Sequence, residues 1–151
     1  MKPYSESCVQ NREPILSVIE PLFRDRKDVL EIGSGTGQHA VYFAAKMPHL
    51  TWHTSDLAEN HDGIRAWLNE AALPNTTGPV SLDVLDRPWS APEADAVFSA
   101  NTTHIMHWDS VVALFGGVGE LLRKRGLFCL YGPFNYGGEY TSESNAQFDE
   151  W

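Results

Sequence analysis

The chain has 151 residues, 20 acidic against 11 basic side chains, and a formal net charge of −9. This length fits a single domain over residues 1–151 with a sizeable buried core, and a hydrophobic content of 42% is ordinary for globular proteins. The acidic balance disfavours nonspecific binding to nucleic acid or to acidic membranes, because such binding needs clustered lysines and arginines.

The N-terminal segment has no apolar core of the kind that secretory signals contain, and no apolar run approaches the length of a membrane span. The two cysteines, Cys8 and Cys129, are far apart and lack the spacing of metal ligands, and the six histidines are scattered. Cys129 lies in an apolar run, which predicts a buried thiol. We therefore expect a cytoplasmic protein in a reducing compartment, with the nucleus left open, and no metal site.

Residues 1–10 are polar and contain a proline, so we expect an arm or a lid rather than a core element. Asn11 is suited to cap a helix that follows, and Pro21 should kink this helix or end it early. Apolar residues recur along it with the period of an amphipathic helix, at Ile15, Val18, Ile19, Leu22 and Phe23.

Five short segments rich in β-branched or aromatic residues predict strands, at 29–32, 50–55, 80–84, 95–100 and 127–131. Residues 74–79 are predicted as a loop. Helices are predicted at 40–47, from a cap at Asn60 to 71, from a cap at 109 or 110 to 125, and from Ser142 onward. Glycines at 116, 117 and 119 should weaken the third of these helices. The alternation predicts an α/β fold with a mostly parallel sheet and helices on both faces.

Three glycines follow the first predicted strand at alternate positions. A dinucleotide-binding turn, Gly-x-Gly-x-x-Gly, would need its third glycine where the chain has Gln38, and the Gly-Lys-Ser/Thr of a P-loop is absent. The pattern Glu31-x-Gly33-x-Gly35-x-Gly37 instead resembles motif I of class I S-adenosylmethionine-dependent methyltransferases. That cofactor carries an ammonium and a sulfonium and no phosphate, so an acidic Glu31 suits it. The alternative is a glycine-rich turn that binds nothing.

Polar residues end the other strands, at the edge where parallel sheets bind ligands. Asp56 is placed to accept hydrogen bonds from both ribose hydroxyls, and Asp83 from an adenine amino group, with Leu57 and Val84 as apolar faces for the ring. Each acid alone has the alternative of a solvated turn residue or a helix cap. The predicted cofactor-binding residues are Glu31, Gly33, Ser34, Gly35, Thr36, Gly37, Asp56, Leu57, Asp83, Val84 and Asn101.

Methyl transfer is an in-line displacement that mainly requires alignment of the acceptor and exclusion of water. A general base is needed only when the acceptor is protonated. The candidates near the ends of the fourth and fifth strands are His104, Asn135 and Tyr136. The alternatives are a helix-start histidine bonded to backbone, for His104, and a Gly-Pro turn that Asn135 and Tyr136 merely shape. No Asn-Pro-Pro-Tyr signature follows the fourth strand, which weakens the case for a nucleobase amine as acceptor.

Five stretches that span almost the whole chain resemble a small, functionally uncharacterised family of class I methyltransferase-like proteins, once known only as a domain of unknown function. They are 11–16, 29–43, 48–52, 99–106 and 130–138. The resemblance implies a Rossmann-like class I methyltransferase fold, S-adenosylmethionine as cofactor, and methyl transfer to a small-molecule or protein acceptor that it does not identify. Family members continue further, so we expect the last C-terminal strands to be missing. The fifth strand would then be an exposed edge through which the chain could dimerise.

Two functions remain open at this point. The first is an S-adenosylmethionine-dependent methyltransferase, and the second is a non-catalytic cofactor-binding or partner-binding protein on the same fold. A nicotinamide-dependent oxidoreductase is disfavoured by Gln38. We also expect the N-terminal arm, with Tyr4, Asn11 and Arg12, to fold over the cofactor, although a plain helix cap is the alternative for Asn11.

Overall fold

The computed structural model describes residues 2–100, 108–132, 135–136, 139–140 and 145–150. The helices are α1 (Glu6–Leu22), α2 (Gln38–Lys46), the short 3-10 helix η1 (Ala58–Asn60), α3 (His61–Ala71) and α4 (Trp108–Leu121). The strands are β1 (Asp28–Glu31), β2 (Thr51–Asp56), β3 (Thr76–Ser81), β4 (Ala94–Ala100), β5 (Leu122–Gly132), β6 (Asn135–Tyr136), β7 (Glu139–Tyr140) and β8 (Asn145–Glu150). No helix in this part of the chain has the length and apolar character needed to cross a membrane.

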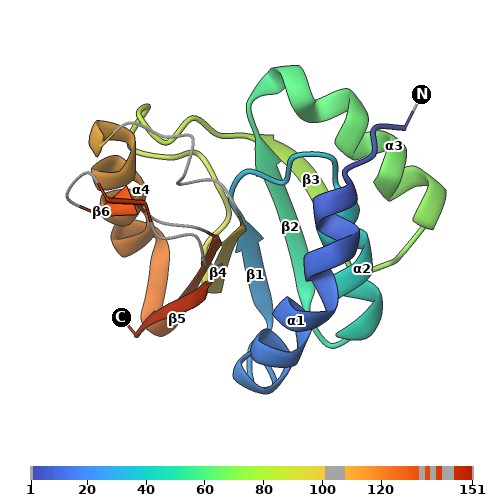
Figure 1. The fold of residues 1–151 in the computed structure, drawn as a ribbon, viewed down its shortest axis with the longest axis horizontal. Coiled ribbons are helices and arrows are strands. Elements are labelled where there is room, and N and C mark those ends of the chain that lie inside the picture. Colours follow the sequence, from blue (N-terminus) through green and yellow to red (C-terminus); the bar gives the residue numbers. More distant parts are fainter. Residues whose placement is uncertain (1, 101–107, 133–134, 137–138, 141–144, 151) are drawn as a thin grey trace.

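Six strands form one sheet in the order β3-β2-β1-β4-β5-β8, and β6 pairs with β7 outside it. Strands β1 to β5 are parallel, and β8 runs antiparallel to β5. Helices α1, α2 and α3 lie on one face of the sheet and α4 lies on the other (Figure 1). The predicted α/β architecture, with a mostly parallel sheet and helices on both faces, is therefore confirmed.

The segment after β5 differs from the prediction. Residues 145–150 form strand β8 instead of part of a helix that begins at Ser142, a residue outside the described ranges, and β8 pairs with β5 from Leu127 to Gly132. This pairing satisfies backbone N–H and C=O groups that an edge strand would expose to solvent. Strand β5 is thus not the exposed edge that the sequence predicted. A dimer through a sheet edge stays a prediction and would have to use β3 or β8.

Three elements occupy other positions than predicted. Strand β5 begins at Leu122, within the helix that was predicted to run to 125, because Leu122 already pairs with Ala94 of β4. Contacts between distant segments also accompany the other two differences. Helix α1 begins before Asn11, which is not its cap but lies inside it, with its Oδ1 2.9 Å from Nε2 of His39 on α2. Strand β3 covers 76–81 instead of 80–84, because these residues pair with β2 in a parallel register. Pro79 is tolerated there because β3 is an edge strand, where a missing N–H costs no hydrogen bond to a second neighbour.

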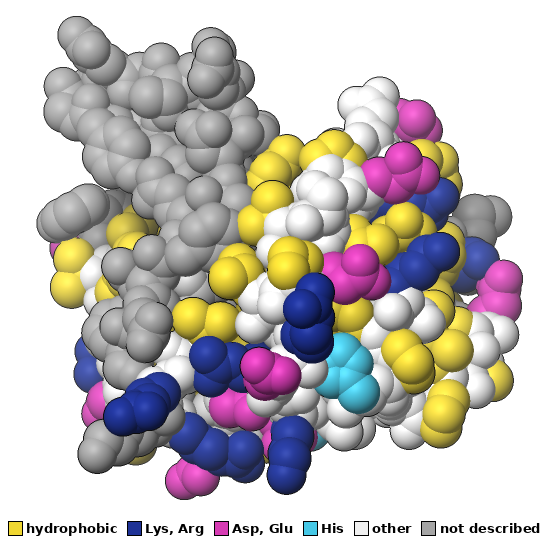
Figure 2. All heavy atoms as spheres, turned by 90° about the horizontal axis from the view of Figure 1, so that it is seen from below, with side chains coloured by type: hydrophobic (Ala, Val, Ile, Leu, Met, Phe, Trp, Pro, Cys, Tyr) yellow, Lys and Arg dark blue, Asp and Glu magenta, His cyan; other side chains and the backbone are white. Residues whose placement is uncertain are grey.

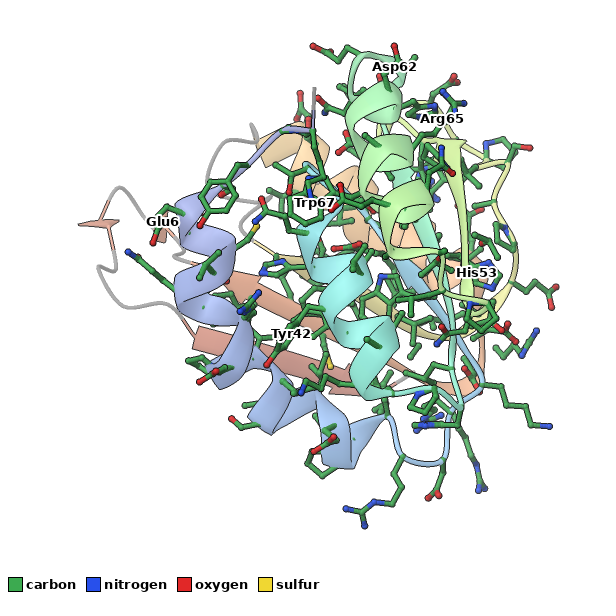
Figure 3. All side chains as sticks on the ribbon, turned by 90° about the vertical axis from the view of Figure 1, so that its right-hand side faces the viewer. Glu6, Tyr42, His53, Asp62, Arg65 and Trp67 are labelled. Atoms are coloured by element: carbon green, nitrogen blue, oxygen red, sulfur yellow. The ribbon has the colours of Figure 1, made fainter. Side chains whose placement is uncertain are left out.

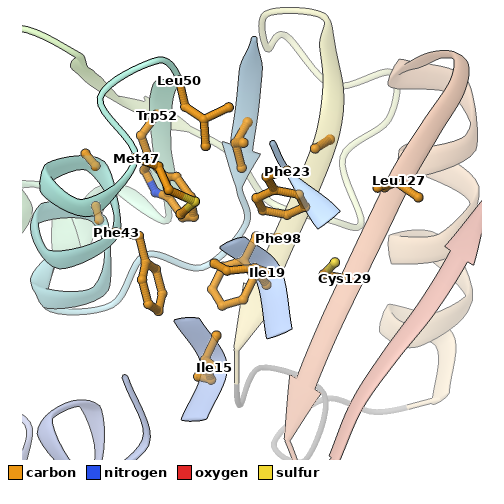
Figure 4. Close-up of a cluster of buried hydrophobic side chains, with 14 of the residues drawn as sticks. Ile15, Ile19, Phe23, Phe43, Met47, Leu50, Trp52, Phe98, Leu127 and Cys129 are labelled. Carbon is orange, nitrogen blue, oxygen red and sulfur yellow. The ribbon is translucent and has the colours of Figure 1, made fainter. Parts of the chain in front are cut away.

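Two hydrophobic clusters flank the sheet. The cluster on the side of α1, α2 and α3 contains the fully buried aromatic side chains Phe23, Phe43, Trp52 and Phe98 (Figure 4). The cluster on the side of α4 is mainly aliphatic, with Leu30, Val97, Leu114, Val118 and Phe128. Cys129 belongs to the first cluster, and burial raises the pKa of its thiol to about 12, so the predicted buried thiol is confirmed.

The segment between β3 and β4 packs on α4 through two of the glycines that were predicted only to weaken this helix. A Cβ on Gly117 would lie 2.2 Å from the ring of Trp89, and a Cβ on Gly116 would lie 2.4 Å from Nη1 of Arg87. Arg87 also forms an ion pair with Glu120 on α4. The two glycines therefore leave the space in which this segment crosses the helix.

We expect Gly117→Ala to lower the free energy of unfolding by about 1–2 kcal/mol, measured by urea denaturation. Overpacking against Trp89 should cost about 1–3 kcal/mol, which exceeds the gain of about 1 kcal/mol in helix propensity. In a Trp89→Ala background the same substitution should be neutral or stabilising. An equal loss in both backgrounds would contradict this role for the glycine.

Candidate functional site

The glycine turn, residues 33–37, joins β1 to α2 and is held against the end of β2. Its three glycines have left-handed backbone conformations, with φ of 73° at Gly33, 60° at Gly35 and 95° at Gly37. The N–H of Ser34 donates to the carbonyl of Ser55 at 2.8 Å, and Oγ of Ser34 accepts from the N–H of Ser55 at 3.1 Å. The glycines are required because side chains rarely tolerate these φ values, and the two bonds fix the turn in place.

Two of these glycines leave different kinds of space. A Cβ on Gly37 would lie 3.2 Å from both Cα of Ile64 and Cβ of Trp67, so this glycine lets α3 approach the turn closely. A Cβ on Gly35 would meet no atom within 4 Å. Gly35 thus presents bare backbone to open space, as a turn that cradles a ligand must.

The carboxylate of Asp56, the last residue of β2, is bonded directly to this turn. Its Oδ2 accepts from the N–H of Gly35 at 2.7 Å, and its Oδ1 accepts from the N–H of Leu57 at 2.7 Å and from Nδ2 of Asn60 at 3.0 Å. A carboxylate can accept about four hydrogen bonds, so it keeps capacity for a ligand hydroxyl. Because the N–H of Gly35 already serves a carboxylate, it is not offered to a phosphate.

Glu31, the last residue of β1, is 1% exposed. Its Oε1 accepts from Nε1 of Trp52 at 3.1 Å. Burial is the main cause that raises the pKa of the Glu31 carboxyl to about 7, and the nearby charge of Asp56 raises it further, against the lowering effect of hydrogen bonds from Trp52 and Ser34. A bound cation would favour the charged form of Glu31.

Thr36 completes the turn rather than extending into the open space. Its Oγ1 donates to Oε1 of Gln38 at 2.9 Å and accepts from the N–H of Gln38 at 3.2 Å. These two bonds hold Gln38, the first residue of α2, which occupies the position where a dinucleotide-binding turn would have glycine. From the sequence, Gln38 served only as an argument against a dinucleotide ligand, and its contacts with Thr36 could not be predicted.

The residues predicted to surround adenine come from two segments, one directly after β2 and one after β3. The backbone N–H of Leu82 donates to the carbonyl of Asp56 at 3.1 Å, which brings the segment after β3 to the end of β2. Leu57 is 42% exposed and Val84 is buried. Asp83 does not end β3 as predicted but follows it in an exposed turn, where its Oδ1 accepts from the N–H of Leu85 at 3.0 Å.

The acceptor side of the site falls largely outside the described structure. Asn101 and His104 lie in the undescribed range 101–107. The backbones of Asn135 and Tyr136 form β6, but their side chains are not described. The four positions therefore stay sequence predictions.

A strap formed by residues 2–5 crosses α3 and reaches the glycine turn. Nζ of Lys2 lies 3.9 Å from the ring centroid of Trp67, and Nε1 of Trp67 donates to the carbonyl of Pro3 at 2.5 Å. Oε1 of Gln38 accepts from the N–H of Ser5. In Figure 3, Trp67 points toward the N-terminal segment. The predicted arm thus ends at Ser5, and its anchors could not be read from local sequence.

Asn11 and Arg12, expected to fold over the cofactor with this arm, contact α2. The guanidinium of Arg12 lies 4.6 Å from the ring centroid of Tyr42. Asn11 bonds to His39, whose pKa is lowered to about 4, mainly by burial. These contacts give both residues a packing role between α1 and α2.

The opposite end of the molecule, seen in Figure 2, carries lysines and arginines mixed with acids. Segments 24–27 and 123–125 hold six of the 11 basic residues, and Nη1 of Arg26 donates to the carbonyl of Arg125 at 2.8 Å. Asp28 pairs there with His53 at 3.1 Å. Basic residues thus gather away from the glycine turn, which carries the two carboxylates. Among the described residues, no cluster of three or more His, Cys, Asp or Glu could hold a metal ion.

Comparisons with known proteins place the chain in a family and in a fold. Residues 2–151 match the model of a family described as "Protein of unknown function (DUF938)". Among solved structures, an O-methyltransferase family protein from Burkholderia thailandensis superposes with a TM-score of 0.73 at 19% identity, over 86% of this chain and 40% of that one. The S-adenosylmethionine-dependent methyltransferase SibL, in its apo form, gives 0.75 at 20% identity, over 87% and 38%. PKMT2 from Rickettsia typhi in complex with AdoHcy gives 0.61 at 19% identity, over 71% and 21%.

These likenesses establish the fold. The predicted Rossmann-like methyltransferase fold is confirmed by structures that share no more than 20% identity with the chain. The chain spans 40% or less of the length of each of these three proteins.

We expect the effect of Glu31→Gln on the free energy of unfolding to be more favourable at about pH 8 than at about pH 5. The folded-state pKa of Glu31, about 7, lies above its ordinary value of 4.5, so the folded state binds more protons between these values. Ionisation of Glu31 therefore lowers stability as pH rises through this window, by up to about 3 kcal/mol, and the glutamine variant lacks this loss.

The measurement is urea denaturation of both proteins at the two pH values. His39 has the opposite effect, because its lowered pKa makes stability rise as pH increases from about 4 to 6.5. It is present in both proteins and cancels in the difference. A difference in stability that does not change with pH would contradict the assignment to Glu31.

Proposed function

We propose that this chain, which belongs to the DUF938 family of proteins of unknown function, binds S-adenosylmethionine at its glycine turn and serves in methyl transfer. One observation carries the proposal: Gly35 presents open backbone, and the carboxylate of Asp56 occupies the N–H of Gly35 that a phosphate would need. A second carboxyl, that of Glu31, interacts with Ser34 of the same turn and with Asp56. Carboxylates suit the ammonium and hydroxyl groups of this cofactor and repel a pyrophosphate. The likeness to proteins named as methyltransferases supports the proposal further.

The proposal assigns a residue to each part of the cofactor. Glu31 would face the ammonium, and Asp56 would accept from the ribose hydroxyls with its remaining capacity. Leu57 and Val84 would cover the adenine ring, with Asp83 at its amino group. The bound cofactor supplies a methyl group activated by a sulfonium. The protein would fix its position and exclude water from it.

The acceptor side is proposed from the sequence. Asn101 would end β4 beside the cofactor, and His104, Asn135 and Tyr136 would contact a small-molecule or protein acceptor. A general base among them is needed only for an acceptor that is protonated at neutral pH. The proposal includes a cytoplasmic location.

The direct test is calorimetric titration with S-adenosylhomocysteine and, separately, with NAD. We expect micromolar affinity for the first and no binding of the second. Asp56→Ala should weaken binding by about 10- to 100-fold, because hydrogen bonds to a charged group contribute about 1.5–3 kcal/mol. Gly35→Ala should abolish binding, because its methyl group would enter the open space.

The matched control is Asp25→Ala, which removes an exposed carboxylate near the opposite end of the sheet and should leave affinity unchanged. Circular dichroism should show that every variant is folded. Tighter binding of NAD than of S-adenosylhomocysteine, or no binding by the folded chain, would refute the proposal for this chain.

We also propose that residues 2–5 act as a lid on the bound cofactor, since their anchors lie on both α3 and the residue that begins α2. Trp67→Phe removes the hydrogen bond to Pro3 but keeps an aromatic ring beneath Lys2. We expect dissociation of S-adenosylhomocysteine to become about 3- to 10-fold faster, measured by stopped flow, because one bond contributes about 1 kcal/mol. Tyr4→Phe is the control, since its hydroxyl donates to Oε2 of Glu6, the first residue of α1. Equal rates in both variants would exclude the lid.

A further inference from the structure

A tryptophan on β2 holds the carboxylate at the end of β1. Trp52 is fully buried, and its ring centroid lies 5.5 Å from that of Phe43 and 5.7 Å from that of Phe98 (Figure 4). These contacts fix the ring, so its Nε1 is aimed at Oε1 of Glu31 at 3.1 Å. A phenylalanine could fill much of this space, and the indole adds a donor that needs a buried partner.

The surroundings of Glu31 provide little compensation for a negative charge. Hydrogen bonds from Trp52 and Ser34 favour ionisation, and the carboxylate of Asp56 on β2 opposes it. The thiol of Cys8 on α1 also interacts with Glu31, and its own pKa is raised, mainly by burial. Helix α2 contributes neutral His39 to the adjacent aromatic cluster, and β4 places Phe98 beside Glu31 in the strand register.

An ionised carboxylate buried in this way is costly unless a cation pairs with it. The glycine turn offers open space beside Gly35, which is bonded to the end of β2, and Ser34 of the same turn interacts with Glu31 at the end of β1. A ligand ammonium that enters there would supply the missing positive charge. Binding of the ligand and ionisation of the carboxyl would then favour each other.

We propose that Trp52 is a positioning residue that holds Glu31 for the ammonium of the cofactor, and that Glu31 releases its proton when this ammonium binds. The carboxylic O–H bond breaks, the electron pair stays on the carboxylate, and the proton passes to the buffer. This inference rests on the proposed function. It adds a hydrogen-bond donor and a linked proton to the cofactor site.

The test counts protons by calorimetry, with titrations in two buffers of different ionisation enthalpy between about pH 6 and pH 8. The probes are S-adenosylhomocysteine, which carries the ammonium, and 5′-methylthioadenosine, which lacks it. The wild-type protein should release about half a proton per S-adenosylhomocysteine near pH 7, more at pH 6 and little at pH 8. It should release none with 5′-methylthioadenosine.

Three variants separate positioning from packing. Glu31→Gln should abolish proton release with S-adenosylhomocysteine. Trp52→Phe should weaken its binding by about 10-fold near pH 7 and shift proton release to higher pH, because the charged carboxylate loses a donor. Phe43→Leu disturbs the same aromatic cluster without removing a donor, so its proton count should match the wild type.

The outcomes distinguish this inference from the function on which it rests. If S-adenosylhomocysteine does not bind to the folded protein, the proposed function fails. If it binds with the same proton count in the wild type and in Glu31→Gln, or if both probes give the same count, only the inference that Glu31 releases a proton is refuted. If Trp52→Phe is folded and keeps the wild-type count and affinity, Trp52 has no positioning role. If Trp52→Phe does not fold, the two probes and the Glu31→Gln variant still decide the linked proton.

Discussion

The hydrogen bond from the N–H of Gly35 to Oδ2 of Asp56, 2.7 Å long, is the contact on which the site depends. It joins the centre of the glycine turn to the last residue of β2 and adds to the two bonds between Ser34 and Ser55. The turn can present bare backbone only while it stays in its left-handed conformation, and these bonds keep it there. They also leave a negative group where a phosphate-binding turn would offer free N–H donors.

The second constraint is the different setting of two carboxylates at one end of the sheet. Asp56 accepts three hydrogen bonds from nearby donors, whereas Glu31 is enclosed by the core and has Trp52 as its donor from β2. Burial, together with the nearby charge of Asp56, makes the carboxyl of Glu31 hard to ionise. This difference suits a ligand with a cation at one point and hydroxyl groups at another.

The rest of the fold supports this end of the sheet from a distance. The aromatic cluster fixes Trp52, and the strap reaches the turn through Gln38. On the other face, Gly116 and Gly117 let the segment before β4 cross α4. The basic segments 24–27 and 123–125 lie at the amino ends of the strands, away from the two carboxyl groups near the turn.

The sequence by itself determined the α/β class, the turn at 33–37 and the placement of Glu31 and Asp56 at strand ends. These features depend on local patterns: apolar periodicity, glycine spacing and the first polar residue after a strand. Only the tertiary structure decided where α1 and β3 begin, that residues 145–150 form a strand, which donor serves Glu31 and which acceptor serves the N–H of Ser5. Each of these depends on a contact between segments far apart in the chain, which no local pattern encodes. Asp83 shows the same limit, because pairing with β2 set the end of β3 before it.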